Sequence, residues 1–101
     1  MKYLVKLTGR ALRDIETIYS YAEADASQHA FAWFNRLVKS IYTLERFPGR
    51  GPIISENKKF RHLLFGKKPH IYRIIYAVDK RNHVVNVLHI RHGVRAVLPK
   101  D

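Results

Sequence analysis

The 101-residue sequence contains no cysteine, so neither disulfide bonds nor thiolate chemistry is available to it. Four histidines, His29, His62, His70 and His83, lack the spacing of metal ligands, which together with the absence of cysteine argues against a structural zinc site. A glycine-rich phosphate-binding loop and the Gly-x-Ser-x-Gly motif of serine hydrolases are also absent. We therefore predict no metal and no cofactor.

Long hydrophobic runs are missing as well. No segment approaches the ~18 apolar residues that a membrane-spanning helix needs. Lys2, Lys6 and Arg10 interrupt the N-terminal apolar residues before the core of a signal peptide can form. With 47% apolar residues, the chain has enough material for one hydrophobic core. These features predict a soluble, cytoplasmic protein whose residues 1–101 form a single domain.

Acidic residues are scarce, with eight Asp and Glu against 19 Lys and Arg, which gives a net charge of +11. The imbalance lies in the later part of the chain. Residues 1–30 carry four side chains of each sign, whereas residues 31–101 carry fifteen basic and four acidic ones. A basic surface of this strength favours an anionic partner, either nucleic acid or an acidic protein, over a merely solubilising role.

Hydrophobic periodicity predicts an α+β fold with the element order β-α-α-β-β-β. The expected elements are a strand at 2–7, a helix at about 9–23, a second helix that follows the connection 23–27 and runs to about 46, and strands at about 60–65, 70–78 and 83–91. Thr8 is a candidate N-cap of the first helix, and two prolines and two glycines in 47–52 end the second. We expect an antiparallel helical hairpin packed on a small, mostly antiparallel sheet, with a polar loop at 53–59.

Each helix has an apolar stripe that predicts its buried face. The stripes are Leu12, Ile15, Ile18, Tyr19 and Ala22 in the first helix, and Ala30, Phe34, Leu37, Val38, Ile41 and Leu44 in the second. Trp33 lies off the second stripe. Either it belongs to a core shared with the loop at 47–55, or it borders an exposed groove for a partner's helix.

Arginines at alternating positions mark the three later strands. Arg61, Arg73 and Arg91 have apolar neighbours, so alternation can place all three on one sheet surface. Such a surface would bind a phosphate backbone or an acidic peptide. The alternative is three separately solvated side chains. Lys58 and Lys59, at the entry to the first of these strands, can extend an anion-binding track.

Two histidines in or next to the last strand have different expected roles. His89 lies inside the strand, where a histidine is more often packed than catalytic. His92 lies at the strand end beside Gly93, where its imidazole can act as a general acid or base near neutral pH.

Four segments together resemble the ParE/RelE superfamily of type II toxins. They are LTGRALRDIETIYSYA, LERFPGRGP, YRIIYAVD and VLHIRHGVR. In this order and at these spacings they cover nearly the whole chain, and they are more similar to the ParE branch than to the RelE branch. The resemblance implies a RelE/ParE-like fold and a toxin encoded beside a small ParD-like antitoxin, with which it forms a hetero-oligomer.

The resemblance also implies a cellular target. ParE-like members, which serve in plasmid stabilization and growth arrest, are associated with poisoning DNA gyrase by binding, without catalysis of their own. RelE-like members instead cleave mRNA in the ribosomal A site, where basic residues stabilise phosphate and a residue near the C-terminus moves the proton. Arg61, Arg73 and Arg91 can fill the basic positions, but the tail after His92 contains no tyrosine, which leaves His92 as the only acid/base candidate.

The resemblance leads to three functional hypotheses: a gyrase inhibitor, a ribosome-dependent endoribonuclease, and an inactive relic that only binds its antitoxin. We expect a disordered acidic antitoxin segment to wrap the basic surface and fold on it. The residues expected in contact with it are Trp33, Leu37, Arg61, Arg73 and Arg91.

Overall fold

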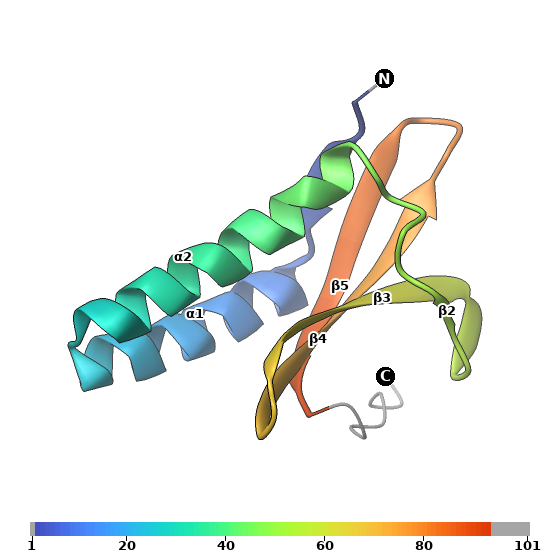
Figure 1. Ribbon diagram of the computed structural model, residues 1–101. Coiled ribbons are helices and arrows are strands. Elements are labelled where there is room, and N and C mark those ends of the chain that lie inside the picture. The colour runs from blue at the N-terminus through green and yellow to red at the C-terminus, as the bar shows by residue number, and fades with distance from the viewer. Residues whose placement is uncertain (1, 94–101) are drawn as a thin grey trace.

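Two helices cover one face of a twisted five-stranded sheet in the computed structural model, which describes residues 2–93 (Figure 1). In chain order the elements are β1 (Leu4–Leu7), α1 (Gly9–Asp25), α2 (Gln28–Tyr42), a 3-10 turn η1 (Thr43–Glu45), β2 (Ile53–Ile54), β3 (Asn57–Lys67), β4 (His70–Asp79) and β5 (Val84–His92). The strands lie in the order β1-β5-β4-β3-β2. Among the strands within residues 2–93, β1 and β5 are the one parallel pair. The predicted α+β architecture, with a helical hairpin on a mostly antiparallel sheet, is confirmed.

Side-chain caps fix where the helices begin. The Thr8 hydroxyl accepts a hydrogen bond from the Ala11 amide at 3.1 Å, which confirms the predicted cap. Ser27 caps α2 in the same way through the amide of Ala30. Ala26, in the left-handed region with φ 57°, ends α1. The short link makes α1 and α2 an antiparallel hairpin, as expected (Figure 1). No helix within residues 2–93 is long and apolar enough to cross a membrane.

The main core lies between the helical hairpin and the sheet. Its buried members are Ala11, Ile18, Leu37, Ile41, Leu44, Ile74, Tyr76, Val85, Val87 and Ile90. The predicted stripe of α2 is largely confirmed by the burial of Leu37, Ile41 and Leu44. The stripe of α1 is rotated toward Ala11, so the expectation that Leu12 and Tyr19 are buried is wrong, and both are at least 40% exposed.

The segment predicted as a polar loop at 53–59 contains strand structure. Ile53 and Ile54 form β2, and β3 begins at Asn57, three residues before the expected start. A register irregularity separates the two pairs of this short hairpin, Ile53 with Arg61 and Ile54 with Asn57. The hairpin brings Glu56 to Arg73 on the sheet face that the helices leave open.

A bulge in β5 determines which way the end of this strand faces. Ile75 pairs with His89 and Tyr76 pairs with Val87, which leaves Leu88 as an extra residue. Val85, Val87 and Ile90 all reach the core despite the break in alternation. His89 and Arg91 consequently point away from the helices, and His92 points toward them.

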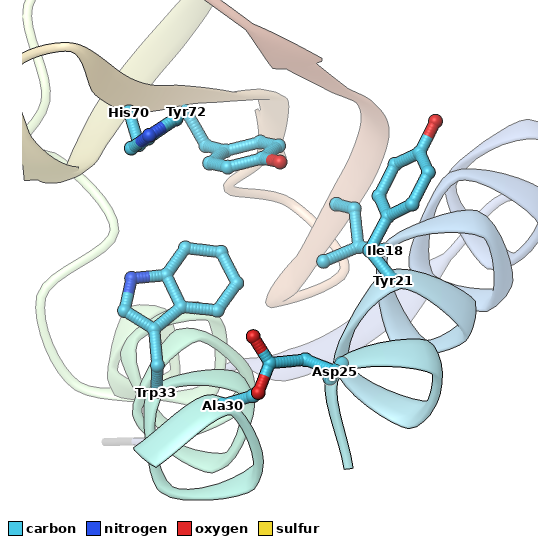
Figure 2. A pocket seen from close by; sticks show the side chains of 8 residues that line it. Ile18, Tyr21, Asp25, Ala30, Trp33, His70 and Tyr72 are labelled. Atoms are coloured by element: carbon cyan, nitrogen blue, oxygen red, sulfur yellow. The ribbon is translucent and has the colours of Figure 1, made fainter. Parts of the chain in front are cut away.

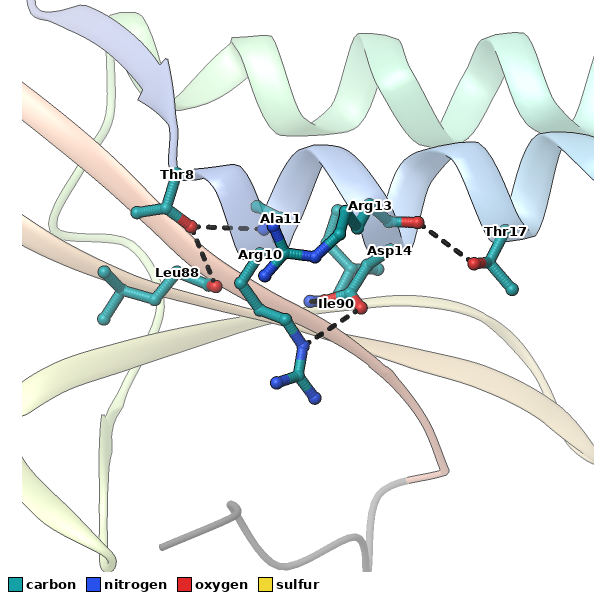
Figure 3. A network of polar contacts seen from close by, with 8 residues as sticks. All are labelled: Thr8, Arg10, Ala11, Arg13, Asp14, Thr17, Leu88 and Ile90. Atoms are coloured by element: carbon teal, nitrogen blue, oxygen red, sulfur yellow. Dashed lines mark hydrogen bonds and ion pairs between the residues drawn. The ribbon is translucent and has the colours of Figure 1, made fainter. Parts of the chain in front are cut away.

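Side chains of α1 and its cap satisfy the polar groups around this bulge (Figure 3). The Thr8 hydroxyl donates to the Leu88 carbonyl at 3.1 Å. Asp14 Oδ2 accepts from the Ile90 amide at 3.0 Å, and Asp14 Oδ1 lies 3.5 Å from Arg10 Nε. Because β1 pairs only with residues 84–87, these contacts replace a neighbouring strand along the last part of β5.

Candidate functional site

Arg73 and Arg91 lie directly opposite each other on neighbouring strands, on the face away from the helices. The predicted shared surface is therefore confirmed for this pair. Within the described part of the chain, the guanidinium of Arg91 makes no hydrogen bond or ion pair. Arg91 is therefore the available cation of this face.

The guanidinium of Arg73 is already engaged. Arg73 is 5% exposed, and its Nη1 and Nη2 donate to the two carboxylate oxygens of Glu56 at 2.7 and 3.0 Å. Its Nε donates to His62 Nδ1 at 2.9 Å. This bidentate pair uses the geometry in which a guanidinium binds a carboxylate most strongly. An external phosphate cannot use the same guanidinium edge while Glu56 occupies it.

The contacts of Arg73 shift the titration of both neighbours. Its hydrogen bond holds the pKa of Glu56 at about 2, well below the ordinary 4.5, against a smaller opposing effect of burial. Burial lowers the pKa of His62, and the charge of Arg73 lowers it further. His62 is therefore a neutral imidazole at pH 7, with Nδ1 as the acceptor.

Arg61 does not share the surface of the other two arginines, and that part of the prediction is wrong. It pairs with Tyr76, a core residue, so it faces the helix side, whereas Arg73 pairs with Leu64 on the opposite face. Arg61 Nη1 donates to the Gly51 carbonyl at 2.7 Å and to the Gly49 carbonyl at 3.3 Å. Arg61 thus holds the loop after η1.

Lys58 and Lys59 are both exposed at the start of β3, as their place in the sequence suggested. They lie next to the hairpin that carries Glu56. An anion-binding role for the two lysines stays a prediction.

A groove opens between the helical hairpin and the end of the sheet (Figure 2). Its volume is about 340 Å³, and its walls come from α1, α2 and the start of β4. Tyr21, Trp33, Asp25, His70 and Tyr72 line it together with Ile18, Ala22 and Ala30. A second hollow of about 580 Å³ lies on the other side of Trp33, where Arg36, Lys67 and Lys68 contribute positive charge.

Trp33 separates these two hollows. Its ring centroid is 5.6 Å from that of Phe65 and 5.4 Å from that of Tyr72. Of the two alternatives for Trp33, the structure therefore favours the border of a groove over a core shared with the loop at 47–55. Leu37 is fully buried, with 0% exposure, so it cannot contact a partner directly and that expectation is wrong.

His92 lies on the helix side of the sheet, opposite to Arg91. It pairs with Tyr72, and its ring centroid lies 4.9 Å from that of Tyr72 and 5.7 Å from that of His70. The structure does not bring His92 together with Arg73 and Arg91. The tail from residue 94 on, whose lack of tyrosine singled out His92, lies outside the described residues. Residues 2–93 contain no cluster of side chains suited to a metal ion.

Sequence reasoning missed Glu56 and His62. A signal for Glu56 was present, because it is the only acidic residue between Arg46 and Val78, in a stretch rich in Lys and Arg. A lone carboxylate in such a stretch is a natural counterion for a buried arginine. The partner could not be identified from sequence, since Arg73 lies seventeen residues away and in another strand.

Comparisons with known proteins agree with this fold. A family model described as the ParE toxin of the type II toxin–antitoxin system parDE matches residues 5–97. A chain of the chromosomal ParDE system from P. aeruginosa is similar at 19% identity and a TM-score of 0.70, with 90% of this chain and 96% of that chain covered. No curated protein sequence matches the chain.

Two further solved structures are similar. A chain of the RelBE2 toxin–antitoxin complex from Mycobacterium tuberculosis shares 21% identity, with a TM-score of 0.66 and coverage of 92% of this chain and 100% of that chain. A chain of the intact E. coli RelBE complex shares 16% identity, with a TM-score of 0.64 and coverage of 92% and 99%. At these identities the structures support a common fold.

Proposed function

The chain belongs to the ParE toxin family of type II toxin–antitoxin systems, and from this premise we propose that it inhibits DNA gyrase by binding and is neutralised by a ParD-like antitoxin. The main support for a binding mechanism is that the guanidinium of Arg73 is already bound to Glu56. This central arginine is buried and bidentate to Glu56, so the phosphate-stabilising position of a ribonuclease is already filled.

The available proton-transfer groups also fit a nuclease poorly. A carboxylate with a pKa of about 2 is a weak base at neutral pH, because general bases work best with a pKa near the operating pH. His92 is on the opposite face from Arg91. The face that carries Arg73 and Arg91 then serves to bind a partner, with the half-buried Arg91 as its available cation.

One observation favours the second candidate, a ribosome-dependent endoribonuclease. His62 is neutral at pH 7 because of its lowered pKa, and it lies on the same face as Arg73 and Arg91. Because Nδ1 accepts from Arg73 Nε, Nε2 carries the proton of the neutral ring and can donate a hydrogen bond to a reacting phosphate beside the arginines. His62→Gln is therefore the variant that tests this candidate.

The groove beside Trp33 is the proposed antitoxin site. Its apolar walls, from Tyr21, Trp33 and Tyr72, fit one face of an amphipathic segment, and Arg36 and Lys68 beside it fit acidic residues of the same segment. Of the contacts expected from sequence, Trp33 lines this groove. Arg91 lies on the opposite face of the sheet, so an antitoxin segment reaches both residues only by wrapping around the sheet. Leu37 and Arg73 are left out because they are buried, and Arg61 because it is bound to the loop after η1.

Two assays on one preparation test the target. Supercoiling by purified gyrase should fall as the toxin is added, and primer extension on translated mRNA should show no new stops. Codon-phased cuts with unaffected supercoiling would reject gyrase, and loss of those cuts in His62→Gln would establish the nuclease. Unchanged results in both assays, together with no growth arrest on expression, would support the inactive relic.

Co-purification with the product of the adjacent reading frame tests the antitoxin site. Tyr21, 66% exposed, lines the groove, whereas Tyr42, 47% exposed, lies outside it. Tyr21→Ala should weaken the complex in moderate salt, and Tyr42→Ala should leave it intact. Equal effects of the two variants would place the antitoxin elsewhere.

A further inference from the structure

The loop at 46–51 holds an aromatic side chain out to solvent on a fixed backbone. Phe47 is 64% exposed, although two buried or half-buried side chains tie down the residues that follow it. The Tyr76 hydroxyl, deep in the core, donates to the Pro48 carbonyl at 2.7 Å and accepts from the Gly51 amide at 3.1 Å. The Arg61 guanidinium binds the Gly51 carbonyl from the other side.

The loop is also closely packed at its end. A Cβ at Gly51 would lie 2.2 Å from the His62 carbonyl oxygen and 2.7 Å from the Tyr76 hydroxyl, so only glycine fits there. A loop fixed in this way presents Phe47 in one place rather than as part of a mobile segment. Holding a large apolar ring in water brings no stability, and a preorganised aromatic ring is a favourable contact for a ligand.

Phe47 forms one wall of a hollow of about 330 Å³ at the C-terminal end of α2. Tyr42 provides a second exposed ring. Lys39, Arg46 and Arg50 line the same hollow, with Glu45 as its only acidic member. Arg50 is held in place by donating to the Thr43 hydroxyl at 2.6 Å.

This hollow is separate from the groove beside Trp33. It lies at the end of the helical hairpin where α2 leads into the loop before β2, whereas the groove is at the end that carries the α1–α2 connection (Figure 1). The antitoxin site proposed above therefore leaves it open.

Two exposed rings among three cations are complementary to single-stranded nucleic acid. Such a strand offers flat base surfaces and regularly spaced phosphates, and proteins bind it by stacking bases on aromatic side chains within a basic groove. In a duplex the bases are stacked on one another. An acidic peptide offers the charge without the flat surfaces.

We propose that the hollow between Tyr42 and Phe47 binds single-stranded DNA, with a base stacked on Phe47 and the backbone along Lys39 and Arg46. The choice of DNA over RNA rests on the proposed function, because gyrase acts on DNA. The binding itself is a property of the toxin alone, and it is measured without gyrase.

The test is fluorescence anisotropy of a labelled twelve-nucleotide oligothymidylate titrated with the full chain. We expect Phe47→Ala to raise the Kd roughly tenfold, within the range known for single base–aromatic stacks. Phe47→Leu should bind as weakly as Phe47→Ala, because it keeps apolar area without a flat ring, and Phe47→Trp should bind like the parent chain. Arg46→Gln should reduce the slope of log K against log salt by about 0.7.

Matched variants control for exposure and charge. Tyr19→Ala removes another exposed ring, and Lys80→Gln removes a charge from the exposed β4–β5 turn. Tyr19→Ala should leave the Kd unchanged, and Lys80→Gln should leave the salt slope unchanged. Melting temperatures of the Phe47 variants within a few degrees of the parent chain would show that they are folded.

Several results would overturn the proposal. Base stacking on Phe47 would be refuted by unchanged affinity in Phe47→Ala or by tight binding of Phe47→Leu. It would equally be refuted by stronger binding of a twelve-base-pair duplex, or by displacement of the oligonucleotide by a polyglutamate peptide. Tighter binding of oligouridylate than of oligothymidylate would reject DNA as the strand. Gyrase inhibition without oligonucleotide binding would refute this inference alone, whereas Phe47-dependent oligonucleotide binding without gyrase inhibition would refute only the gyrase target.

Discussion

Replacement of Glu56 by glutamine tests how firmly Arg73 is engaged. Glu56→Gln keeps the size of the side chain and removes the charge that both Nη atoms of Arg73 contact at 2.7 and 3.0 Å. The buried guanidinium then has a neutral amide in place of a carboxylate. We expect the variant to fold and to be less stable at pH 7.

The size of the loss follows from the pKa of Glu56. A pKa lowered from 4.5 to about 2, at about 1.4 kcal/mol per unit, corresponds to roughly 3.5 kcal/mol for a fully shielded pair. The Glu56 side chain is 24% exposed, and solvent screens the pair. We therefore expect a loss of about 1–2 kcal/mol, which corresponds to a fall in Tm of about 5–15 °C for a domain of this size.

The pH dependence has a definite sign. The pKa of Glu56 is lower in the folded than in the unfolded chain, so the carboxylate stabilises the fold fully above about pH 4.5. That contribution is lost as pH falls toward 2. Urea unfolding of the parent chain and of Glu56→Gln should therefore differ at pH 7 and converge between pH 4.5 and 2.

Glu45→Gln is the matched control, because Glu45 lies 3.9 Å from Arg46 at the surface and should contribute under about 0.5 kcal/mol. Equal stability of Glu56→Gln and the parent chain at pH 7 would refute the account of Arg73 as an occupied site. A stability difference that persists unchanged at pH 2 would show that charge is not the cause.

Three further variants test other parts of the structure. Tyr76→Phe should lower the free energy of unfolding by about 1–3 kcal/mol, because it leaves the Gly51 amide and the Pro48 carbonyl without their buried partner, and amide hydrogen exchange of the loop should rise. Arg91→Ala should keep its melting temperature within a few degrees while toxicity on expression is lost, and a large drop in melting temperature would make Arg91 structural. Asp14→Ala should destabilise the chain by about 1 kcal/mol or more through loss of its hydrogen bond to the end of β5, and an unchanged urea midpoint would contradict that role.

The two helices and the longer strands β1, β3, β4 and β5 were predictable from sequence because their signals are local. Apolar stripes at helical spacing, the Thr8 cap and the proline–glycine stretch after η1 each act within a few residues. Placing Leu37 in the buried stripe was correct. Counting it as a partner contact contradicted that placement, since a residue central to a buried stripe has no surface to offer.

The arginine face was only partly predictable because it depends on register. Alternation describes a single strand, whereas the pairing of Arg61 with Tyr76 fixes its side relative to Arg73. Arg91 shares the face of Arg73 only because of the bulge at Leu88. Strict alternation from Val87 would have turned Arg91 toward the core. The ion pair of Glu56 with Arg73 joins a hairpin tip to another strand, and no local pattern encodes it.

The central claim, that the chain inhibits gyrase by binding, is tested most directly by the amount of cleaved DNA that purified gyrase retains. Plasmid, gyrase and ATP are incubated with increasing amounts of the toxin, the reaction is stopped with detergent and protease, and linear DNA is measured. The account predicts that linear DNA rises with toxin concentration, that the product of the adjacent reading frame abolishes the rise, and that Arg91→Ala fails to produce it. Linear DNA that stays at the level of gyrase alone, at toxin concentrations that arrest translation, would contradict the account.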